Sequence, residues 1–274
     1  MPEMGLAGKV AIVTGAGSRA DGIGNGRAAA ILLAREGVKV GLLDANKAWA
    51  EATKAMIDKE GGTSIVLEAD VTNEASAKAA IDKTVATWGH LDILVNNVGI
   101  SGPVGTAVEV DIAAWDAAMR INVTSMVIMA KYAIPEMRKV GGGSIVNQAS
   151  IAGMLGGHRN LLYATSKGTI IQLTRGMAAN HGEEGIRVNA VAPGLVYTPM
   201  VYTTPAMNDT RREERRNASL LGTEGTGWDI GKAIVYLVSD QARWVTGVTL
   251  PVDAGVTAAF GSSLKFASSP QKPQ

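Results

Sequence analysis

The sequence predicts a three-layer α/β fold in which helices cover both faces of a doubly wound, seven-stranded parallel sheet. Short apolar runs alternate with longer helical patterns along almost the whole chain. The runs are nearly continuously hydrophobic, as expected for strands covered on both faces, and strands that alternate with helices favour parallel pairing. We expect strands at residues 10–14, 38–43, 65–67, 91–95, 144–147, 186–191 and 247–252, and helices at 24–36, 47–60, 74–88, 112–139, 161–181 and 227–239.

Residues 1–260 are expected to form a single domain with a small helical lid over the substrate. Segment 197–226 interrupts the alternation of strands and helices and carries the charged run Arg211–Arg216. Such a run is usually a solvent-exposed helix face, but this one follows the sixth strand, where open α/β sheets bind ligands. We therefore interpret 197–226 as the lid. Residues 261–274 are polar and are expected to form a frayed C-terminal tail.

The composition excludes several classes of function. Of the 274 residues, 46% are hydrophobic and 19% are charged, which is typical of a globular chain with a large core. The net charge of +1 gives no electrostatic reason to expect a nucleic-acid or membrane partner. The absence of cysteine excludes disulfides and thiol nucleophiles, and the three scattered histidines predict no metal centre.

The expected location follows from segments that the chain does not contain. No apolar run approaches the ~20 residues of a membrane span. The N-terminus has neither the basic region nor the hydrophobic stretch of a secretory signal. We therefore expect a cytoplasmic protein.

A glycine-rich turn between the first strand and the first helix predicts a binding site for a dinucleotide. The strand ends in Thr14 and continues as Gly-Ala-Gly-Ser-Arg-Ala-Asp-Gly-Ile-Gly up to Gly24. Glycines at such a junction let the backbone turn tightly and approach a pyrophosphate, which the positive end of the helix attracts. The strand–turn–helix context makes this signal more specific than a lone glycine-rich loop and predicts a Rossmann-type domain.

Two charged residues bear on the choice of nicotinamide cofactor. Asp44 ends the second strand, where a carboxylate accepts hydrogen bonds from both ribose hydroxyls of NAD and repels the 2′-phosphate of NADP. Arg19 lies in the glycine-rich turn and would favour that phosphate. We expect NAD as the cofactor, with NADP possible, because an acidic group at the strand end opposes a phosphate strongly.

Tyr163 and Lys167 lie four positions apart on a predicted helix, so both side chains lie on one face. A phenol has an ordinary pKa of about 10, and a nearby ammonium should lower the pKa of Tyr163 towards neutrality. Ser150, thirteen residues before Tyr163, could hold the oxygen of an alcohol or a carbonyl while Tyr163 moves its proton. The spacing alone also fits an exposed lysine beside a half-buried tyrosine.

Further short segments occur in a characteristic order. Asp70–Val71 follow the third strand, Asn96–Gly99 read Asn-Asn-Val-Gly after the fourth, and Pro193–Thr198 read Pro-Gly-Leu-Val-Tyr-Thr after the sixth. Together with Thr14–Gly24, these segments make the chain resemble the short-chain dehydrogenase/reductase family from about Leu6 to Gly255. The glycine-rich turn is similar to the family's Thr-Gly-x-x-x-Gly-x-Gly pattern but carries three additional residues in its middle.

The resemblance implies a catalytic tetrad of Asn122, Ser150, Tyr163 and Lys167. The family usually shows two serines where this chain has Ala149 and Ser150, and the spacing to Tyr163 identifies Ser150 as the functional one. The resemblance further implies a local helix distortion at Asn122 that positions water near Lys167. Lys167 would also hold the hydroxyls of the nicotinamide ribose.

The resemblance implies the cofactor contacts as well. Asp70–Val71 would contact the adenine, Asn97 would approach the cofactor, and Thr198 with the Pro193–Gly194 backbone would hold the nicotinamide carboxamide. Taken singly, Asp70 and the asparagines are equally well explained as a helix cap and turn formers. The expected cofactor-binding residues are Gly15, Ser18, Arg19, Gly22, Ile23, Gly24, Asp44, Asp70, Val71, Asn97, Gly99, Tyr163, Lys167, Pro193, Gly194, Val196 and Thr198.

These features predict an NAD(P)-dependent oxidoreductase that interconverts a secondary alcohol and a ketone by hydride transfer, with Tyr163 as acid and base. The substrate is expected to be a small-molecule alcohol or ketone. His158 is a candidate for its pocket, although it is more simply explained as a surface loop residue. The family also implies a homotetramer packed through helices 112–139 and 161–181.

Two other functions are alternatives to this prediction. A hydrolase is rejected, because Ser150 lacks the first glycine of a Gly-x-Ser-x-Gly elbow. A dinucleotide-binding protein with a non-redox, scaffold or sensor role is the stronger alternative. Turnover of secondary alcohols or ketones would separate it from the oxidoreductase.

Overall fold

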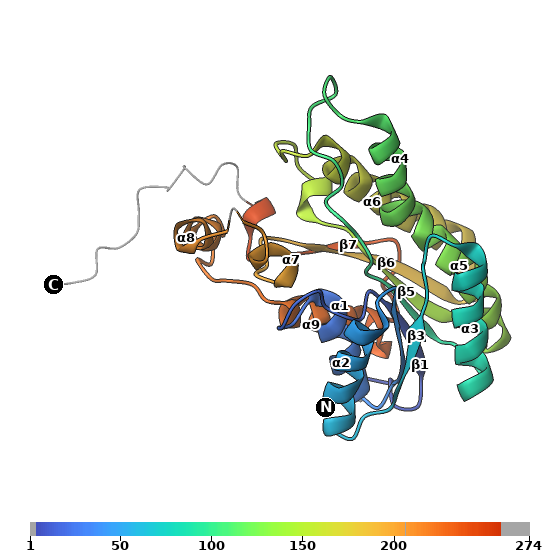
Figure 1. Cartoon of the computed structure of the whole chain (residues 1–274). Helices are drawn as coiled ribbons and strands as arrows, with labels where there is room; N and C mark the ends of the chain where they lie inside the picture. The colour runs from blue at the N-terminus through green and yellow to red at the C-terminus, as the bar shows by residue number, and fades with distance from the viewer. Residues whose placement is uncertain (1–3, 206, 259–274) are drawn as a thin grey trace.

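The computed structural model describes residues 4–205 and 207–258 and confirms the predicted three-layer architecture (Figure 1). Its seven strands are all parallel and lie in the order β3-β2-β1-β4-β5-β6-β7. The predicted tail at 261–274 lies outside the described residues. The strands are β1 Val10–Thr14, β2 Lys39–Asp44, β3 Ser64–Glu68, β4 Ile93–Asn96, β5 Gly143–Gln148, β6 Ile186–Pro193 and β7 Thr249–Val252.

Helices cover both faces of the sheet (Figure 1). On one side lie α1 Asn25–Arg35, α2 Lys47–Lys59 and α9 Gly227–Val238, and on the other lie α3 Glu74–Trp88, α5 Ser125–Lys139 and α6 Leu161–His181. Successive strand side chains point to opposite faces, so Ala11 and Val13 pack in one core while Val10 and Ile12 pack in the other. Within the described residues, no helix has the length and hydropathy that crossing a membrane would require.

Polar caps explain why the predicted helix starts agree closely with the structure. The side chain of Asn46 accepts a hydrogen bond from the backbone N–H of Trp49 at 3.2 Å, and α2 begins at the next residue. Asn73 caps α3 in the same way, accepting from the N–H of Ser76 at 3.0 Å. Each cap satisfies an N–H group that the first helical turn leaves without a partner.

The single helix predicted at 112–139 is interrupted in the structure. It consists of α4 Ile112–Met119, a π-helical turn over Arg120–Thr124, and α5. The side chain of Asn122 within this turn accepts from the N–H of Ile100 at 2.8 Å and donates to the carbonyl of Ile100 at 2.9 Å. These bonds to a distant loop offset the irregular local hydrogen bonding, and π turns of this kind occur frequently at functional sites.

The segment interpreted as a lid, 197–226, contains two helices, α7 Pro199–Tyr202 and α8 Asp209–Asn217. The charged run lies on α8, whose exposed surface agrees with its composition. Arg212 on α8 lies 4.1 Å above the ring centroid of Tyr197 and makes two 2.6 Å bonds to the carboxylate of Glu224. Arg212 therefore connects α8 to residues near both ends of segment 197–226.

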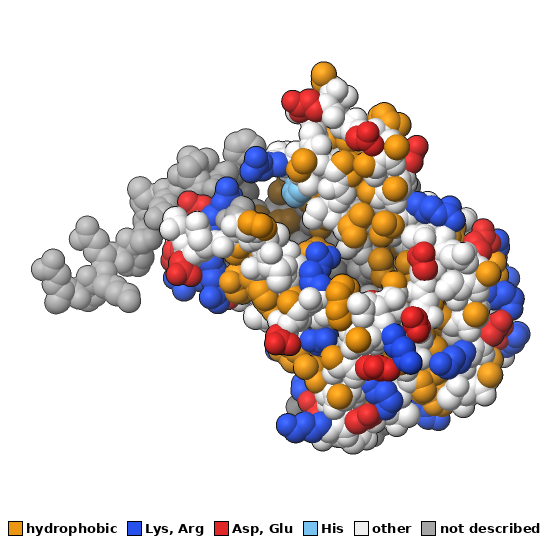
Figure 2. Space-filling model, in the orientation of Figure 1, with side chains coloured by type: hydrophobic (Ala, Val, Ile, Leu, Met, Phe, Trp, Pro, Cys, Tyr) orange, Lys and Arg blue, Asp and Glu red, His pale blue; other side chains and the backbone are white. Residues whose placement is uncertain are grey.

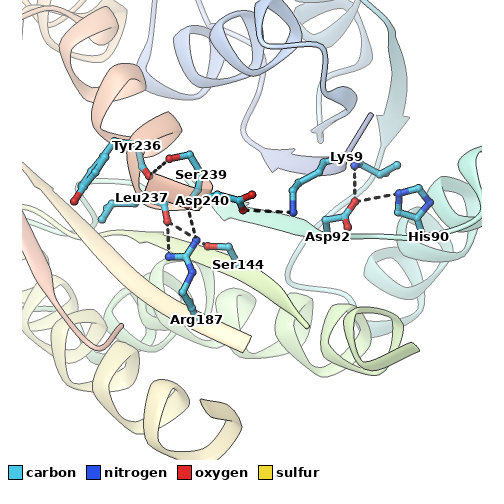
Figure 3. A network of polar contacts seen from close by, with 10 residues as sticks. Lys9, His90, Asp92, Ser144, Arg187, Tyr236, Leu237, Ser239 and Asp240 are labelled. Carbon is cyan, nitrogen blue, oxygen red and sulfur yellow. Dashed lines mark hydrogen bonds and ion pairs between the residues drawn. The ribbon is translucent and has the colours of Figure 1, made fainter. Parts of the chain in front are cut away.

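A polar network lies at the amino-terminal edge of the sheet, where the strands begin (Figure 3). Arg187 on β6 donates to the carbonyl oxygens of Leu237 at 2.7 Å and Ser239 at 3.2 Å, at the C-terminus of α9. A guanidinium placed there satisfies carbonyls that the helix cannot pair and complements the helix dipole. The opposite, carboxyl edge of the sheet is where the ligand cavity lies.

Candidate active site

A cavity of about 390 Å³ opens at the carboxyl edge of the sheet, beside the ends of β1, β2, β4 and β5 and the start of the lid. Ten predicted cofactor residues line it, namely Gly15, Ser18, Arg19, Gly24, Asp44, Asp70, Val71, Asn97, Gly99 and Thr198. Seven others lie outside its wall, namely Gly22, Ile23, Tyr163, Lys167, Pro193, Gly194 and Val196. The described residues contain no cluster of His, Asp and Glu side chains placed to hold a metal ion.

Glycines in the turn after β1 serve two different purposes. A Cβ on Gly26 would lie 2.2 Å from the carbonyl oxygen of Gly15, so Gly26 is where α1 packs directly against the strand end. A Cβ on Gly24 would meet nothing within 4 Å, although Gly24 lines the cavity. Gly24 therefore leaves space for a ligand at the N-terminus of α1, whereas Gly26, which the sequence analysis missed, is required for packing.

Substituting each of these glycines with alanine should separate the two purposes. Gly26→Ala forces a methyl group against backbone and should lower the free energy of unfolding by about 2–3 kcal/mol. Gly24→Ala should leave the thermal midpoint of the cofactor-free protein nearly unchanged but weaken NADH binding by about tenfold or more. Thermal unfolding and NADH titration of both variants measure this, and equal stability loss in the two would contradict it.

The three additional residues of the turn do not fill the cavity. Arg27, which is buried, donates to the carbonyl of Gly22 at 2.6 Å and to the hydroxyl of Thr53 at 3.0 Å. The hydroxyl of Tyr202 on α7 donates to the carbonyl of Asp21. The lengthened turn is therefore supported from both sides, and its residues Ser18 and Arg19 form part of the cavity wall.

Asp44 is held rigidly at the end of β2. One carboxylate oxygen accepts from the N–H of Gly17 at 3.0 Å and the other from the N–H of Asn46 at 2.9 Å, and the residue is 9% exposed. Trp49 lines the cavity beside it. Trp49 and Gly17 were not recognised in the sequence, because only the folded turn brings them next to Asp44.

Asp70 and Asn97 have the structural roles that the sequence analysis left open, and both also line the cavity. The carboxylate of Asp70 accepts from the N–H and the hydroxyl of Thr72, each at 2.8 Å, which forms a tight turn after β3. The side chain of Asn97 donates to the carbonyls of Thr14 at 3.1 Å and Gly15 at 3.0 Å. Asn97 therefore joins the end of β4 to the glycine-rich turn.

Lys167, Tyr163 and Asn122 gather at one end of the cavity. Lys167 is 3% exposed, and its Nζ donates to the carbonyl of Gln148 at 2.8 Å and lies 5.7 Å from the ring centroid of Tyr163. A Cβ on Gly99 would lie 3.3 Å from Lys167 Nζ and 3.6 Å from Asn122 Oδ1. Since Gly99 and Gln148 line the cavity, Lys167 and Asn122 lie directly behind its wall, and the ring of Tyr163 lies beside Lys167.

Asn122 and Ser150 take their positions from backbone contacts. Besides its bonds to Ile100, Asn122 donates to the hydroxyl of Ser166 at 3.1 Å, so it ties the loop after β4 to α6. Ser150 follows β5 and accepts from the N–H of Ala152 at 3.2 Å at the start of a 3₁₀ turn. The expected role of Asn122 in positioning water near Lys167 remains a prediction.

The electrostatics of Tyr163 differ from the sequence-based expectation. Burial raises the pKa of the Tyr163 phenol, and the Ser150 side chain acts in the opposite direction but has the smaller effect. Burial also lowers the pKa of the Lys167 ammonium to about 8, from 10.5 for an ordinary lysine. The expected lowering of the Tyr163 pKa is absent because loss of solvent dominates, and the Lys167 ammonium is itself desolvated and directed at the Gln148 carbonyl.

His158 lies against the phenol ring of Tyr163. The two ring centroids are 4.9 Å apart, and His158 Nδ1 lies 3.2 Å from both the N and the O atoms of Asn160. A second neighbour, Gln148, was missed by the sequence analysis, although a glutamine at the end of a buried apolar strand is itself a signal. Its side-chain oxygen is buried without a hydrogen-bond partner in the described structure.

Comparisons with known proteins show the family to which the chain belongs. A family model described as enoyl-(acyl carrier protein) reductase matches residues 18–257. The chain is 41% identical to 2-(S)-hydroxypropyl-CoM dehydrogenase 3 of Xanthobacter autotrophicus, over 92% of this chain and 98% of that protein.

Two solved structures are also similar. One, described as a short-chain dehydrogenase/reductase from Burkholderia xenovorans, has a TM-score of 0.88 and 40% identity, and covers 93% of this chain and 99% of its own. A 7α-hydroxysteroid dehydrogenase complexed with NADH and 7-oxo glycochenodeoxycholic acid has a TM-score of 0.83 and 34% identity, and covers 92% and 96% of the two chains. The chain belongs to the short-chain dehydrogenase/reductase family of oxidoreductases.

Proposed function

We propose that this protein is an NAD-dependent dehydrogenase that interconverts a secondary alcohol and a ketone, with Tyr163 as the acid and base. The observation that carries the proposal is the position of Tyr163 and the buried Lys167 behind the end of a cavity whose far end holds Asp44. The relative from Xanthobacter is named as a hydroxypropyl-CoM dehydrogenase, and the steroid dehydrogenase structure holds NADH with a 7-oxo compound. Both names support an alcohol or a ketone as the substrate class.

The cavity fits a nicotinamide dinucleotide. The buried oxygens Asn25 Oδ1 and Gln148 Oε1 are without hydrogen-bond partners in the described residues, and both side chains line the cavity. Gly24 leaves open space at the start of α1, where no side chain caps the helix and its N–H groups can bind a phosphate. Asp44 presents a fixed carboxylate to a ribose. When bound, the nicotinamide ring supplies the hydride donor or acceptor.

Each residue of the tetrad has a separate task in this mechanism. Ser150 holds the substrate oxygen, while Tyr163 gives its proton to that oxygen during ketone reduction and removes it during alcohol oxidation. The raised pKa of Tyr163 keeps the phenol protonated in the free protein, which is the form that reduction needs. Lys167 places a positive charge beside the phenol and stabilises the phenolate that oxidation needs.

The substrate is proposed to bind between the lid and the Tyr163 region. Figure 2 shows the surface hollowed between the segment of α7 and α8 and the part of the molecule that carries α4 and α6, with hydrophobic side chains inside. The ring of His158 beside Tyr163 supports its place in this pocket. An alcohol with an apolar body would bury its carbon atoms there while its hydroxyl reaches Ser150.

Asp44 supports NAD over NADP. Both of its oxygens are fixed by backbone N–H groups, so the carboxylate cannot rotate away from a 2′-phosphate. Arg19 is exposed on the turn and would favour that phosphate. We propose that the fixed, largely buried carboxylate decides the preference, since repulsion between like charges is screened least where water is scarce.

A substrate screen with NAD and NADP in parallel tests this function. Secondary alcohols and ketones of increasing size are supplied one at a time. The change in nicotinamide absorbance with each compound reports hydride transfer, and Tyr163→Phe serves as the blank. We expect turnover of at least one pair and at least tenfold higher kcat/KM with NAD than with NADP. Dinucleotide binding without turnover across the panel would instead favour a non-redox role.

The assembly and the location remain proposals. We propose a homotetramer that packs through α4–α5 and α6 against their copies. The exposed apolar side chains Ile112, Val127 and Leu161 on these helices support such packing, with exposed fractions of 65%, 45% and 39%. We also propose that the enzyme acts in the cytoplasm.

A further inference from the structure

The side chain of Gln148, at the carboxyl end of β5, carries an acceptor that the fold leaves unsatisfied. Gln148 Oε1 is buried and has no hydrogen-bond partner in the described part of the chain. A buried oxygen without a donor is costly, and proteins retain such groups chiefly where a ligand or a special function supplies the partner. Gln148 lines the ligand cavity, so a rotation of its carboxamide would bring Oε1 to a donor bound there.

Two observations place Gln148 at the end of the cavity where the reaction occurs. Its backbone carbonyl accepts the hydrogen bond of Lys167 Nζ at 2.8 Å, which puts it next to the tetrad. Thr198 and Met200, at the start of the lid, line the same cavity. On the adenine side, Asp44 ends β2 and Asp70 follows β3, and two strands, β1 and β4, separate β2 from β5.

The direction of the side chain follows from strand geometry. The preceding residue, Asn147, pairs with Asn96 at 2.9 Å and with Thr174 of α6 at 3.1 Å, so its side chain faces the α6 layer. Successive side chains alternate, and Gln148 therefore leaves the strand on the opposite face from Asn147. Lys167 binds the backbone carbonyl of Gln148, and the side-chain oxygen has no hydrogen-bond partner in the described residues.

We propose that Gln148 Oε1 accepts a hydrogen bond from the carboxamide N–H₂ of the nicotinamide and thereby orients the ring for hydride transfer. This inference rests on the proposed function. Phosphates offer no donor, and the adenine amine belongs at the other end of the cavity. The hydroxyls of the nicotinamide ribose are the remaining donors, and the experiment below distinguishes them from the carboxamide. Gln148 is thus a positioning residue for the cofactor, in addition to the tetrad.

A cofactor analogue provides the test. In 3-acetylpyridine adenine dinucleotide a methyl group replaces the carboxamide N–H₂, while the ribose is unchanged. Binding of NADH and of the reduced analogue is measured by calorimetry for the wild type, Gln148→Met and the control Gln241→Met, which makes the same change at an exposed position just after α9. We expect Gln148→Met to weaken NADH binding about five- to tenfold and analogue binding less than twofold, with no change in the control.

Thermal unfolding without cofactor supplies a second readout. Methionine matches the length of glutamine and removes the unsatisfied oxygen, so Gln148→Met should keep or raise the midpoint of the cofactor-free protein while NADH stabilises it less than the wild type. An equal loss for NADH and the analogue would assign the contact to the ribose and overturn the proposal. Unchanged NADH affinity would overturn it as well. A wild type that binds neither dinucleotide would refute the proposed function along with it.

Discussion

Replacing Tyr163 with phenylalanine is expected to lower kcat by about 10³–10⁴-fold. The variant keeps the ring but lacks the hydroxyl that donates or accepts the proton. The rest of the site should be unaffected. Lys167 binds the Gln148 carbonyl rather than the phenol oxygen, so its position does not depend on the hydroxyl of Tyr163. NADH affinity should therefore stay within about twofold of the wild type. Steady-state kinetics with the best substrate of the screen, together with NADH titration, measure both quantities.

His158 provides a control for the Tyr163 substitution. Its ring contacts the ring of Tyr163 but has no assigned proton-transfer role. His158→Phe should raise KM more than it lowers kcat, whereas Tyr163→Phe should act on kcat. A Tyr163→Phe variant that retains more than about a tenth of wild-type kcat would show that another group moves the proton.

Replacing Lys167 with methionine is expected to affect stability and catalysis in opposite directions. Burial holds the pKa of Lys167 at about 8 instead of 10.5, so the folded protein bears the cost of keeping this ammonium out of water. A difference of this size corresponds to about 3 kcal/mol at neutral pH. Lys167→Met should raise the free energy of unfolding at pH 7 by about 2 kcal/mol, since loss of the bond to Gln148 offsets part of the gain. Turnover should fall about 10²–10⁴-fold.

The pH dependence of the free energy of unfolding tests the direction of the stability change in Lys167→Met. Between pH 8 and pH 10.5 the unfolded chain binds a proton at Lys167 that the folded protein has released, so wild-type stability rises relative to the variant as pH increases. The difference in the free energy of unfolding between Lys167→Met and the wild type should be largest below pH 8 and should vanish towards pH 10.5. Urea unfolding at several pH values measures it, with the exposed Lys232→Met as control. A gap that does not change with pH would contradict the low pKa.

Much of the fold was predictable because local patterns and the final packing agree. The strand β1 is apolar from Val10 to Val13 and is buried at every position, so its hydrophobic run alone identified it. Asn46 and Asn73 marked helix starts because a side-chain cap depends only on neighbouring residues. The π turn at Asn122 had a different origin. It depends on hydrogen bonds to Ile100, twenty-two positions away, and the helical pattern from 112 to 139 contains no trace of that contact.

For the candidate site, the sequence predicted the proximity of some side chains but not their pKa shifts. Spacing brought Tyr163 and Lys167 to one helix face, as expected. The sign of the pKa shift of Tyr163 was not available from spacing, because it depends on how much solvent the surrounding layers remove. Gly26 was missed for a related reason. A glycine within a helix shows no pattern of its own, and only the position of the Gly15 carbonyl reveals that no larger residue fits.

The two backbone amides that bind Asp44 constrain any attempt to change the proposed preference for NAD to one for NADP. Because the carboxylate also anchors Gly17 and Asn46, exchanging Asp44 for a neutral or basic residue would release the glycine-rich turn and the start of α2 while it removes the repulsion. Redesign would therefore need a substitute acceptor for Gly17, such as a serine at position 44, before adding a cation for the phosphate. Coenzyme choice and the shape of the turn have to be engineered together.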